Sequence, residues 1–346
     1  MKAFSIRDIG VGDGFKPLVI PEIGINHGGS LQVAIEMVDA AKRAGARLIK
    51  HQTHVVEDEM SHLARNVIPG NSKISIYEVM EECALSEDEE RELFCYTESL
   101  GMEFLSTPFS RAAANRLERF GVGAYKIGSG EMNNYPLIEH IAEFGKPMII
   151  STGMNDIQAI DKTVNIVERK NVPYALLHTT NLYPTKPEQV RLGAMQEMMK
   201  YFPQAVIGLS DHTCTNTACI AAMALGAKVV ERHFTDRMSR VGNDIVCSAD
   251  EIRLKELLQA ADDVGKMLGG EKKALEEEQV TIDFAFATVV STAEIHAGEK
   301  FTYENLWVKR PGTGEILAEH YEELIGKRAK CDISRDTHIS YEMVEG

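Results

Sequence analysis

Short runs of β-branched and apolar residues recur eight times in the first 235 residues, and each run becomes polar at its carboxyl end. Segments with helical periodicity separate most of these runs. Strands that alternate with helices pair in parallel, and eight such units close on themselves, so the pattern predicts a (β/α)8 TIM barrel. The predicted strands are 18–27, 47–53, 103–109, 124–131, 147–154, 174–183, 205–213 and 228–235.

One predicted connection is much longer than the others. The roughly fifty residues between the second and third predicted strands begin with an acidic stretch punctuated by glycine and proline, and they continue into a predicted helix at 86–100. Loops of this length inside a compact domain are usually lids or binding loops. Asn71, Ser75 and Tyr77 are therefore candidate contact residues.

The pattern changes after the last predicted barrel helix, at about 250–268. A glycine pair and a charged segment follow it, as is typical of a solvated linker. Short β-like pieces then run to residue 346 and include the single tryptophan, Trp307. The predicted organisation is a barrel domain at 1–270, a linker at 271–283 and a small, mostly β domain at 284–346.

Composition excludes several classes of partner. The 37 Lys and Arg residues against 52 Asp and Glu give a net charge of −15, which argues against non-specific nucleic-acid binding and a basic membrane anchor. There is no run of about 18 apolar residues and no apolar leader. The six cysteines show no C-x-x-C spacing, which favours reduced thiols. We therefore expect a cytoplasmic protein that binds neither nucleic acid nor membrane.

Polar residues stand at the carboxyl end of every predicted strand. In a parallel barrel these ends all open on one face, where active sites are built. For a serine or threonine, capping of the next helix or a hydrogen bond to a neighbour is the alternative role. The candidates are Glu22, Asn26, Lys50, Gln52, Thr107, Lys126, Ser129, Glu131, Ser151, Asn181, Tyr183, Ser210, His212, Glu231 and His233.

Two lysines among these candidates point to an anionic substrate. Lys50 and Lys126 lie within strand patterns and are expected to face into the barrel, where an unpaired ammonium group is costly. Together with the nearby hydroxyls and glycine-flanked backbone amides, they predict a site for a compound that carries phosphate and carboxylate. No glycine-rich dinucleotide fingerprint follows the first strand, which disfavours a nucleotide cofactor fold.

Two histidines are candidate metal ligands. His212 and His233 end the last two predicted strands, and imidazole suits a divalent ion such as Zn, Mn or Fe. The alternative is that each is a satisfied polar residue, because two ligands fall short of a full coordination set. Glu22 and Glu231 stand near them and could orient water or complete the coordination shell.

Seven short motifs follow one another along the predicted barrel. They are EIGINH at 22–27, KHQT at 50–53, STPF at 106–109, KIGSGE at 126–131, STGM at 151–154, GLSDH at 208–212 and ERHF at 231–234. With these motifs in this order, the chain resembles the bacterial sialic acid synthases over essentially its whole length. The terminal segment from Asn305 to Gly312, NLWVKRPG, is similar to the antifreeze-like (SAF) domain of that family.

The resemblance implies that phosphoenolpyruvate condenses with the open-chain aldehyde of N-acetylmannosamine to give N-acetylneuraminate and phosphate, by C–O cleavage. It implies a divalent metal at His212 and His233, Mn²⁺ above all, with Mg²⁺ or Co²⁺ as alternatives. The same condensation on a 2,4-diacetamido-2,4,6-trideoxyhexose, giving legionaminate or pseudaminate, is the rival reading. A third possibility is a sugar-binding or assembly protein without catalytic activity. The joint presence of Glu22, the two lysines and the two histidines disfavours it.

Roles follow from the resemblance residue by residue. Glu22, Lys50, Lys126 and Glu231 are the expected catalytic residues, with Glu22 helping to deprotonate water. Arg310 is expected to reach the site from the terminal domain of a partner subunit in a domain-swapped homodimer. The expected substrate contacts are Gln52, Asn71, Ser75, Thr107, Ser129, Glu131, Ser151, Asn181, Tyr183, Ser210 and Asp244.

Overall fold

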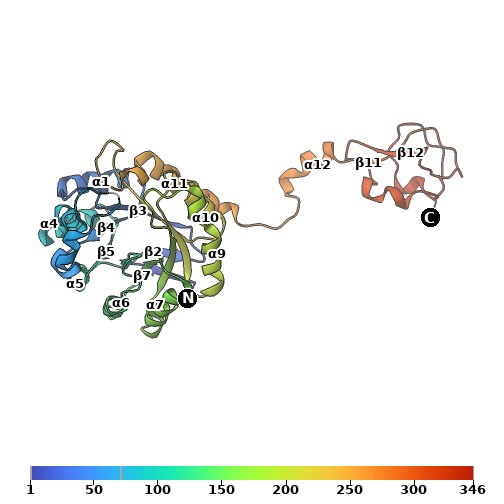
Figure 1. Cartoon of the computed structure of the whole chain (residues 1–346). Helices are drawn as coiled ribbons and strands as arrows, with labels where there is room; N and C mark the ends of the chain where they lie inside the picture. Colours follow the sequence, from blue (N-terminus) through green and yellow to red (C-terminus); the bar gives the residue numbers. More distant parts are fainter. Residues whose placement is uncertain (1, 71, 346) are drawn as a thin grey trace. The chain divides into compact units, whose positions relative to one another are not determined.

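The computed structural model describes residues 2–70 and 72–345 (Figure 1). The chain divides into two compact units, with the boundary between Gly269 and Gly270. The first unit contains a closed barrel of parallel strands and the second a small antiparallel sheet, as the sequence predicted. None of the helices in these described ranges is long and apolar enough to cross a membrane.

Eight strands form the barrel, in the closed order β10-β3-β4-β5-β6-β7-β8-β9. Each is shorter than its predicted run, in most cases because the last residues of the run belong to the loop that follows. The strands are β3 (Leu18–Gly24), β4 (Leu48–Thr53), β5 (Glu103–Pro108), β6 (Tyr125–Ile127), β7 (Met148–Ser151), β8 (Tyr174–Thr179), β9 (Val206–Asp211) and β10 (Val229–His233).

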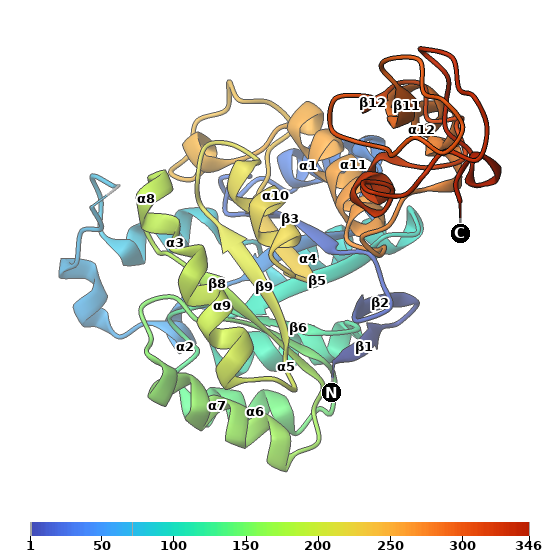
Figure 2. The same cartoon turned by 90° about the vertical axis from the view of Figure 1, so that its right-hand side faces the viewer.

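Helices cover the outside of the barrel, as α6, α7 and α9 show in Figure 2. The first of them begins where the Ser30 side chain accepts a hydrogen bond from the Val33 amide, and ends at Gly45, whose φ of 99° suits glycine. The outer helices are α1 (Leu31–Ala44), α4 (Glu87–Ser99), α5 (Arg111–Phe120), α6 (Tyr135–Ala142), α7 (Ile157–Arg169), α8 (Pro187–Val190), α9 (Leu192–Tyr201), α10 (Thr217–Ala224) and α11 (Glu251–Met267).

A hairpin at the amino terminus closes one end of the barrel. Its strands, β1 (Ala3–Ile6) and β2 (Ile9–Gly12), pair antiparallel. Their apolar side chains join a buried cluster with the first inward residues of the barrel strands, among them Leu48 and Val229. No element was predicted before residue 18, so the hairpin was not anticipated from the sequence. Because the amino end is plugged by apolar side chains, polar chemistry is confined to the carboxyl end.

The long connection between β4 and β5 is folded rather than open. It contains α2 (Val56–Glu59), the 3₁₀ helix η1 (His62–Asn66) and α3 (Ile76–Cys83). Another short 3₁₀ helix, η2 (Ile245–Cys247), lies in the loop after β10. The Asp58 side chain ties α2 to the barrel by accepting a hydrogen bond of 2.8 Å from the Ala112 amide in α5.

The second unit has its own apolar core, which includes Phe301 and Leu306. Its helix α12 starts inside the segment predicted as linker, and the Asp283 carbonyl of that helix accepts a hydrogen bond of 2.7 Å from the Gly312 amide. Residues 279–283 therefore fold with the small unit. Its elements are η3 (Glu276–Glu278), α12 (Gln279–Ala285), β11 (Thr288–Ser291), β12 (Leu306–Lys309), η4 (Ala318–Glu323) and η5 (Tyr341–Met343).

Gly208 lies where strands β9 and β10 approach each other closely. A Cβ at this position would overlap the Val229 carbonyl oxygen of β10 and lie 2.7 Å from Leu177 Cδ2. Because the oxygen belongs to the backbone of a paired strand, it cannot move aside, and we expect Gly208→Ala to lower the free energy of unfolding by about 3 kcal/mol. Gly193→Ala, in α9 with open space around it, is the control and should leave stability unchanged or slightly higher. Equal unfolding midpoints in urea for the two variants would contradict this account.

Candidate active site

Side chains from the carboxyl ends of all eight barrel strands, or the loops directly after them, line one cavity of about 180 Å³. Most of the residues predicted from the sequence lie there. They are Glu22, Lys50, Gln52, Thr107, Lys126, Ser129, Glu131, Ser151, Asn181, Tyr183, Ser210, His212, Glu231 and His233.

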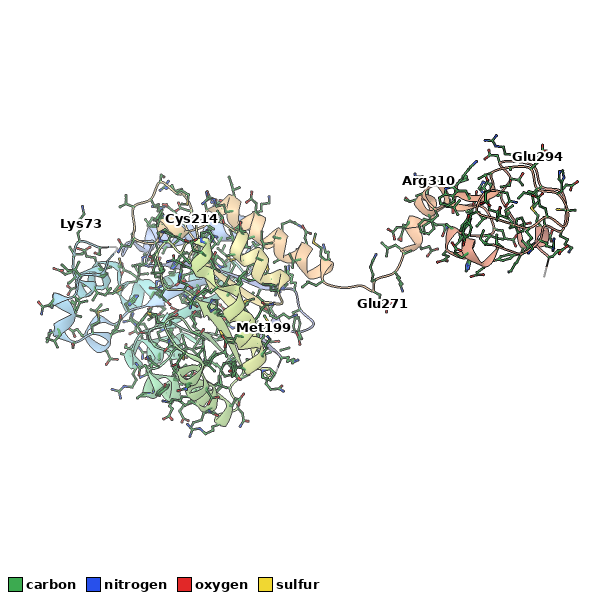
Figure 3. The ribbon with its side chains drawn as sticks, turned by 45° about the vertical axis from the view of Figure 1, so that its right-hand side comes forward. Lys73, Met199, Cys214, Glu271, Glu294 and Arg310 are labelled. Carbon is green, nitrogen blue, oxygen red and sulfur yellow. The ribbon has the colours of Figure 1, made fainter. Side chains whose placement is uncertain are left out.

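The other predicted contacts lie elsewhere or are not described. Ser75 is a helix cap that does not line the cavity: its hydroxyl donates to Glu78 Oε2 at 2.6 Å and accepts from the Glu78 amide. Asp244 is buried in the loop after β10 and does not line the cavity. Asn71 falls outside the described residues. Arg310 is exposed in the second unit, directly after β12 (Figure 3).

Two further residues of the cavity wall were not predicted from the sequence. Thr179, at the end of β8, lines it and satisfies the same strand-end rule that selected the other residues. Phe109 also lines it, but a search for polar side chains could not select an aromatic ring. Asn26, a sequence candidate, instead donates to the Phe234 carbonyl and the Ser248 hydroxyl, each at 2.9 Å, and so ties the loop after β3 to the loop after β10.

The floor of the cavity is a cluster of buried charges. Lys50 donates a hydrogen bond to Glu22, and its Nζ lies 3.8 Å from Glu231 Oε1. Lys126 Nζ lies 3.5 Å from the same Glu231 oxygen. All four side chains are 5% exposed or less. The two inward lysines are thus confirmed in position, but carboxylates already pair with them. An incoming anion would compete with Glu22 and Glu231 for these ammonium groups.

Burial and charge set the protonation of this cluster. Burial alone would raise the pKa of Glu22, but the charges of Lys50 and His233 outweigh it and hold that pKa well below its usual range. Glu22 is therefore an ionised carboxylate at neutral pH. Burial lowers the pKa of Lys126, and the Glu231 charge opposes this shift. Lys126 also donates to the Ser151 hydroxyl at 2.7 Å, which directs its ammonium group toward β7.

Several buried polar atoms of the cavity wall have no hydrogen-bond partner in the described part of the chain. Buried polar groups are nearly always paired, so a group of unpaired ones on one cavity indicates a missing ligand. Gly153 lies close to one of them, since a Cβ there would overlap Asn181 Oδ1 and approach Ser129 Oγ to 2.9 Å. The unpartnered atoms are Thr107 Oγ1, Glu131 Oε2, Asn181 Oδ1, Glu231 Oε2 and His233 Nδ1.

The two histidines meet at the side of the cavity. The ring centroids of His212 and His233 are 5.3 Å apart, and the Tyr183 ring lies 4.1 Å from that of His212. His212 Nδ1 is 2.8 Å from the Thr180 carbonyl oxygen, which can only accept, so the proton is on Nδ1 and Nε2 keeps its lone pair. Burial and the neighbouring His233 lower the pKa of His212 to about 3, which keeps its ring neutral.

The histidine pair fits a divalent metal in part. Neutral imidazole is the form that binds metal, and His233 Nδ1 is buried without a partner. Glu22 Oε2 lies 3.9 Å from His233 Nε2 and is the nearest carboxylate. Across residues 2–70 and 72–345, however, no three His, Cys, Asp or Glu side chains are grouped as a ready metal site. Substrate or water would have to supply further ligands to an ion held here.

Comparison with known proteins identifies the family. The model of the NeuB family matches residues 37–273, and that of the SAF domain matches residues 286–345. The chain belongs to the NeuB family. Two relatives of this NeuB-family chain are the N,N'-diacetyllegionaminic acid synthase of Legionella pneumophila, 34% identical over 94% of each chain, and the human N-acetylneuraminate-9-phosphate synthase, 33% identical over 94% of this chain and 92% of the relative.

A solved structure agrees with this membership. The sialic acid synthetase of Leptospira borgpetersenii superposes with a TM-score of 0.73 at 28% identity, over 81% of this chain and 95% of that one. The matched family segment begins within α1 and ends beyond α11, so it contains seven of the eight barrel strands of this NeuB-family chain.

Glu131 gives the site a dependence on pH. Burial, reinforced by the charge of Glu59, raises the pKa of Glu131 from 4.5 to about 7. The unfolded chain thus loses this proton above about pH 4.5, whereas the folded chain keeps it until about pH 7, so folding becomes less favourable across that interval. Glu131→Gln removes the titration. We expect this variant to gain about 3 kcal/mol of stability relative to wild type between pH 4.5 and pH 8.

Urea unfolding of both proteins at several pH values measures that difference. Glu188→Gln, which changes an exposed carboxylate on α8, is the matched control and should follow the wild-type curve. A Glu131→Gln variant whose stability relative to wild type is constant from pH 4.5 to pH 8 would show that Glu131 titrates normally.

Proposed function

We propose that this protein condenses phosphoenolpyruvate with N-acetylmannosamine and water to give N-acetylneuraminate and phosphate. The observation that carries the proposal is the joint placement of two buried lysines, an ionised Glu22 and the His212–His233 pair on one cavity. Membership of the NeuB family and the synthase activities of two relatives support the same chemistry.

Phosphoenolpyruvate is assigned to the lysine end of the cavity. Lys50 and Lys126 provide the positive charges, and the Ser151 hydroxyl next to Lys126 is a further donor. Ser129 accepts from the Gly153 amide at 3.0 Å, which leaves its own proton free for a phosphate or carboxylate oxygen. When phosphoenolpyruvate binds beside the lysines, Glu22 and Glu231 remain as negative charges on the cavity floor.

The sugar is assigned to the side of the cavity that bears the histidines. Tyr183 and Gln52 line this side with polar groups suited to a hydroxylated ligand. A divalent metal at His212 and His233, Mn²⁺ in our proposal with Mg²⁺ and Co²⁺ as alternatives, would supply Lewis acidity toward the aldehyde. The neutral state of His212 suits this role, because a protonated ring binds no metal.

The proposed bond changes use the residues of the cavity floor. The C2–C3 π electrons of phosphoenolpyruvate form the bond from C3 to the aldehyde carbon, so the aldehyde oxygen gains negative charge and C2 becomes electron-poor. Glu22 and Glu231 stabilise that positive character electrostatically. Water then adds to C2 and gives one proton to Glu22, which passes it to the former aldehyde oxygen and so forms the hydroxyl. The tetrahedral intermediate breaks its C–O bond, and the C2 hydroxyl gives its proton to the departing phosphate and becomes the ketone. Lys50, hydrogen-bonded to Glu22, keeps that carboxylate ionised until water attacks.

Product analysis tests this function. We expect phosphate release and a product with the mass of N-acetylneuraminate when the protein is given phosphoenolpyruvate, Mn²⁺ and N-acetylmannosamine. A chelator should lower the rate, and added Mn²⁺ should restore it. Turnover only with a 2,4-diacetamido-2,4,6-trideoxyhexose would assign the legionaminate or pseudaminate reaction instead. Turnover only with N-acetylmannosamine 6-phosphate would match the human relative, because three added carbons turn position 6 of the hexose into position 9 of the product.

We further propose that the active form is a homodimer in which the small unit of one chain serves the cavity of the other through Arg310. Exposed apolar side chains on the small unit support an interface there. Val280 is 77% exposed, Phe284 60% and Trp307 56%, and such a group on a folded surface is typical of a contact region. Arg310 directly follows the strand that carries Trp307.

Complementation tests the shared site. We expect Glu22→Gln and Arg310→Ala each to be nearly inactive as homodimers. In a co-expressed mixture, half of the dimers would be mixed and each would contain one intact site, so about a quarter of the wild-type activity should return. Homodimers of each variant, expressed alone, are the matched controls. Failure of the mixture to exceed both controls, while forming mixed dimers, would rule out an Arg310 supplied by the partner.

A further inference from the structure

Four side chains form a hydrogen-bonded row that runs from the segment after β4 to the cavity floor. Gln52 Nε2 donates to Glu22 Oε1 at 2.8 Å, and Gln52 Oε1 lies 3.2 Å from His54 Nε2. His54 Nδ1 lies 2.8 Å from Oε2 of Glu59, the last residue of α2. The His54 side chain is 1% exposed and that of Glu59 8%, so water does not separate the members of the row.

The acceptors in this row determine where the protons are. Glu22 is ionised and can only accept, so the amide nitrogen of Gln52 must face it and the amide oxygen must face His54. That oxygen and the Glu59 carboxylate both accept, so both ring nitrogens of His54 must donate. A histidine that donates from both nitrogens is an imidazolium cation.

The surroundings of His54 suit a positive charge. Its ring stacks on that of Phe109, with centroids 4.5 Å apart and planes 14° from parallel, and the face of an aromatic ring attracts a cation. Glu59 provides the counter-charge on α2. Burial and the neighbouring His51 and His54 lower the pKa of His27, and the Glu59 charge helps to raise the pKa of Glu131.

We propose that His54 is a positioning residue that fixes the carboxamide orientation of Gln52, and that Glu59 holds His54 in its doubly protonated form. The two ends of a carboxamide are nearly identical in shape, so packing alone cannot prevent Gln52 from turning over. A turned amide would place its oxygen against the Glu22 carboxylate. The His54 cation excludes this state, because it can donate to the Gln52 oxygen but has nothing to accept with.

The consequence concerns the sugar, and this part rests on the proposed function. With its orientation fixed, Gln52 presents a defined donor and acceptor to a ligand in the cavity, without cost in conformational entropy at binding. Phosphoenolpyruvate is assigned to the lysines, and its proposed contacts include neither Gln52 nor His54. Loss of His54 should therefore weaken the sugar complex and leave the phosphoenolpyruvate complex unchanged.

A double-mutant cycle tests this coupling. We expect His54→Ala to raise KM for the sugar about tenfold, with KM for phosphoenolpyruvate unchanged. In a Gln52→Ala background the same substitution should have no further effect, because there is no carboxamide left to orient. Equal losses in both backgrounds would mean that His54 acts only on the fold, and would overturn the proposal. His178→Gln, which removes another buried histidine bonded to the Val190 carbonyl, is the matched control and should leave both KM values unchanged.

A second measurement is independent of turnover. Nitrogen NMR of the histidine side chains in the full chain at pH 7 should show a ring with both nitrogens protonated that is lost in His54→Ala. Glu59→Gln keeps the ring but removes its counter-charge, so the signal should shift toward neutral imidazole, which provides a test even if His54→Ala fails to fold. A neutral His54 in the wild type would overturn the proposal. Absence of turnover with every sugar would instead reject the proposed function, and the NMR result would still decide the state of His54.

Discussion

The buried charges at the centre of the barrel constrain the rest of the site. Two ammonium groups and two carboxylates share a region from which water is nearly excluded, and each depends on the others for neutralisation. They come from β3, β4, β6 and β10, which only a closed barrel brings together. Removal of one member would leave an uncompensated charge, so the charge balance and the fold stabilise each other.

The alternation of side chains along β4 shows how one strand serves two layers. Lys50 and Gln52 face the cavity, whereas His51 and Thr53 face the outer helices and contact Glu90 of α4. Arg116 of α5 reaches the same carboxylate at 3.0 Å. The outer network is largely buried and contacts the strand from the side opposite the cavity, so the inner residues are held on a rigid element rather than on a loop.

The two ends of the barrel differ in polarity. The amino-terminal hairpin fills one end with apolar side chains, and the unpartnered polar atoms that line the cavity lie at the other end. At the carboxyl end, the loops bring further polar side chains to the cavity. The loop after β4 brings His54 and Glu59 to the edge of the cavity, and Asp58 ties the same segment to α5. In this arrangement a long connection supports the site without having to move over it.

Sequence periodicity by itself determined the barrel, because a strand–helix rhythm repeated eight times has one compact closed solution. It also determined most of the cavity wall, since the carboxyl end of a parallel strand must lie on the common face. Local patterns did not reveal every role of a residue. Ser75, expected to contact substrate, caps α3, and no element was predicted for the apolar hairpin strands. Only the tertiary structure decided that carboxylates neutralise the inward lysines and that His54 faces two acceptors, because pairing between distant segments depends on distances that no spacing along one chain records.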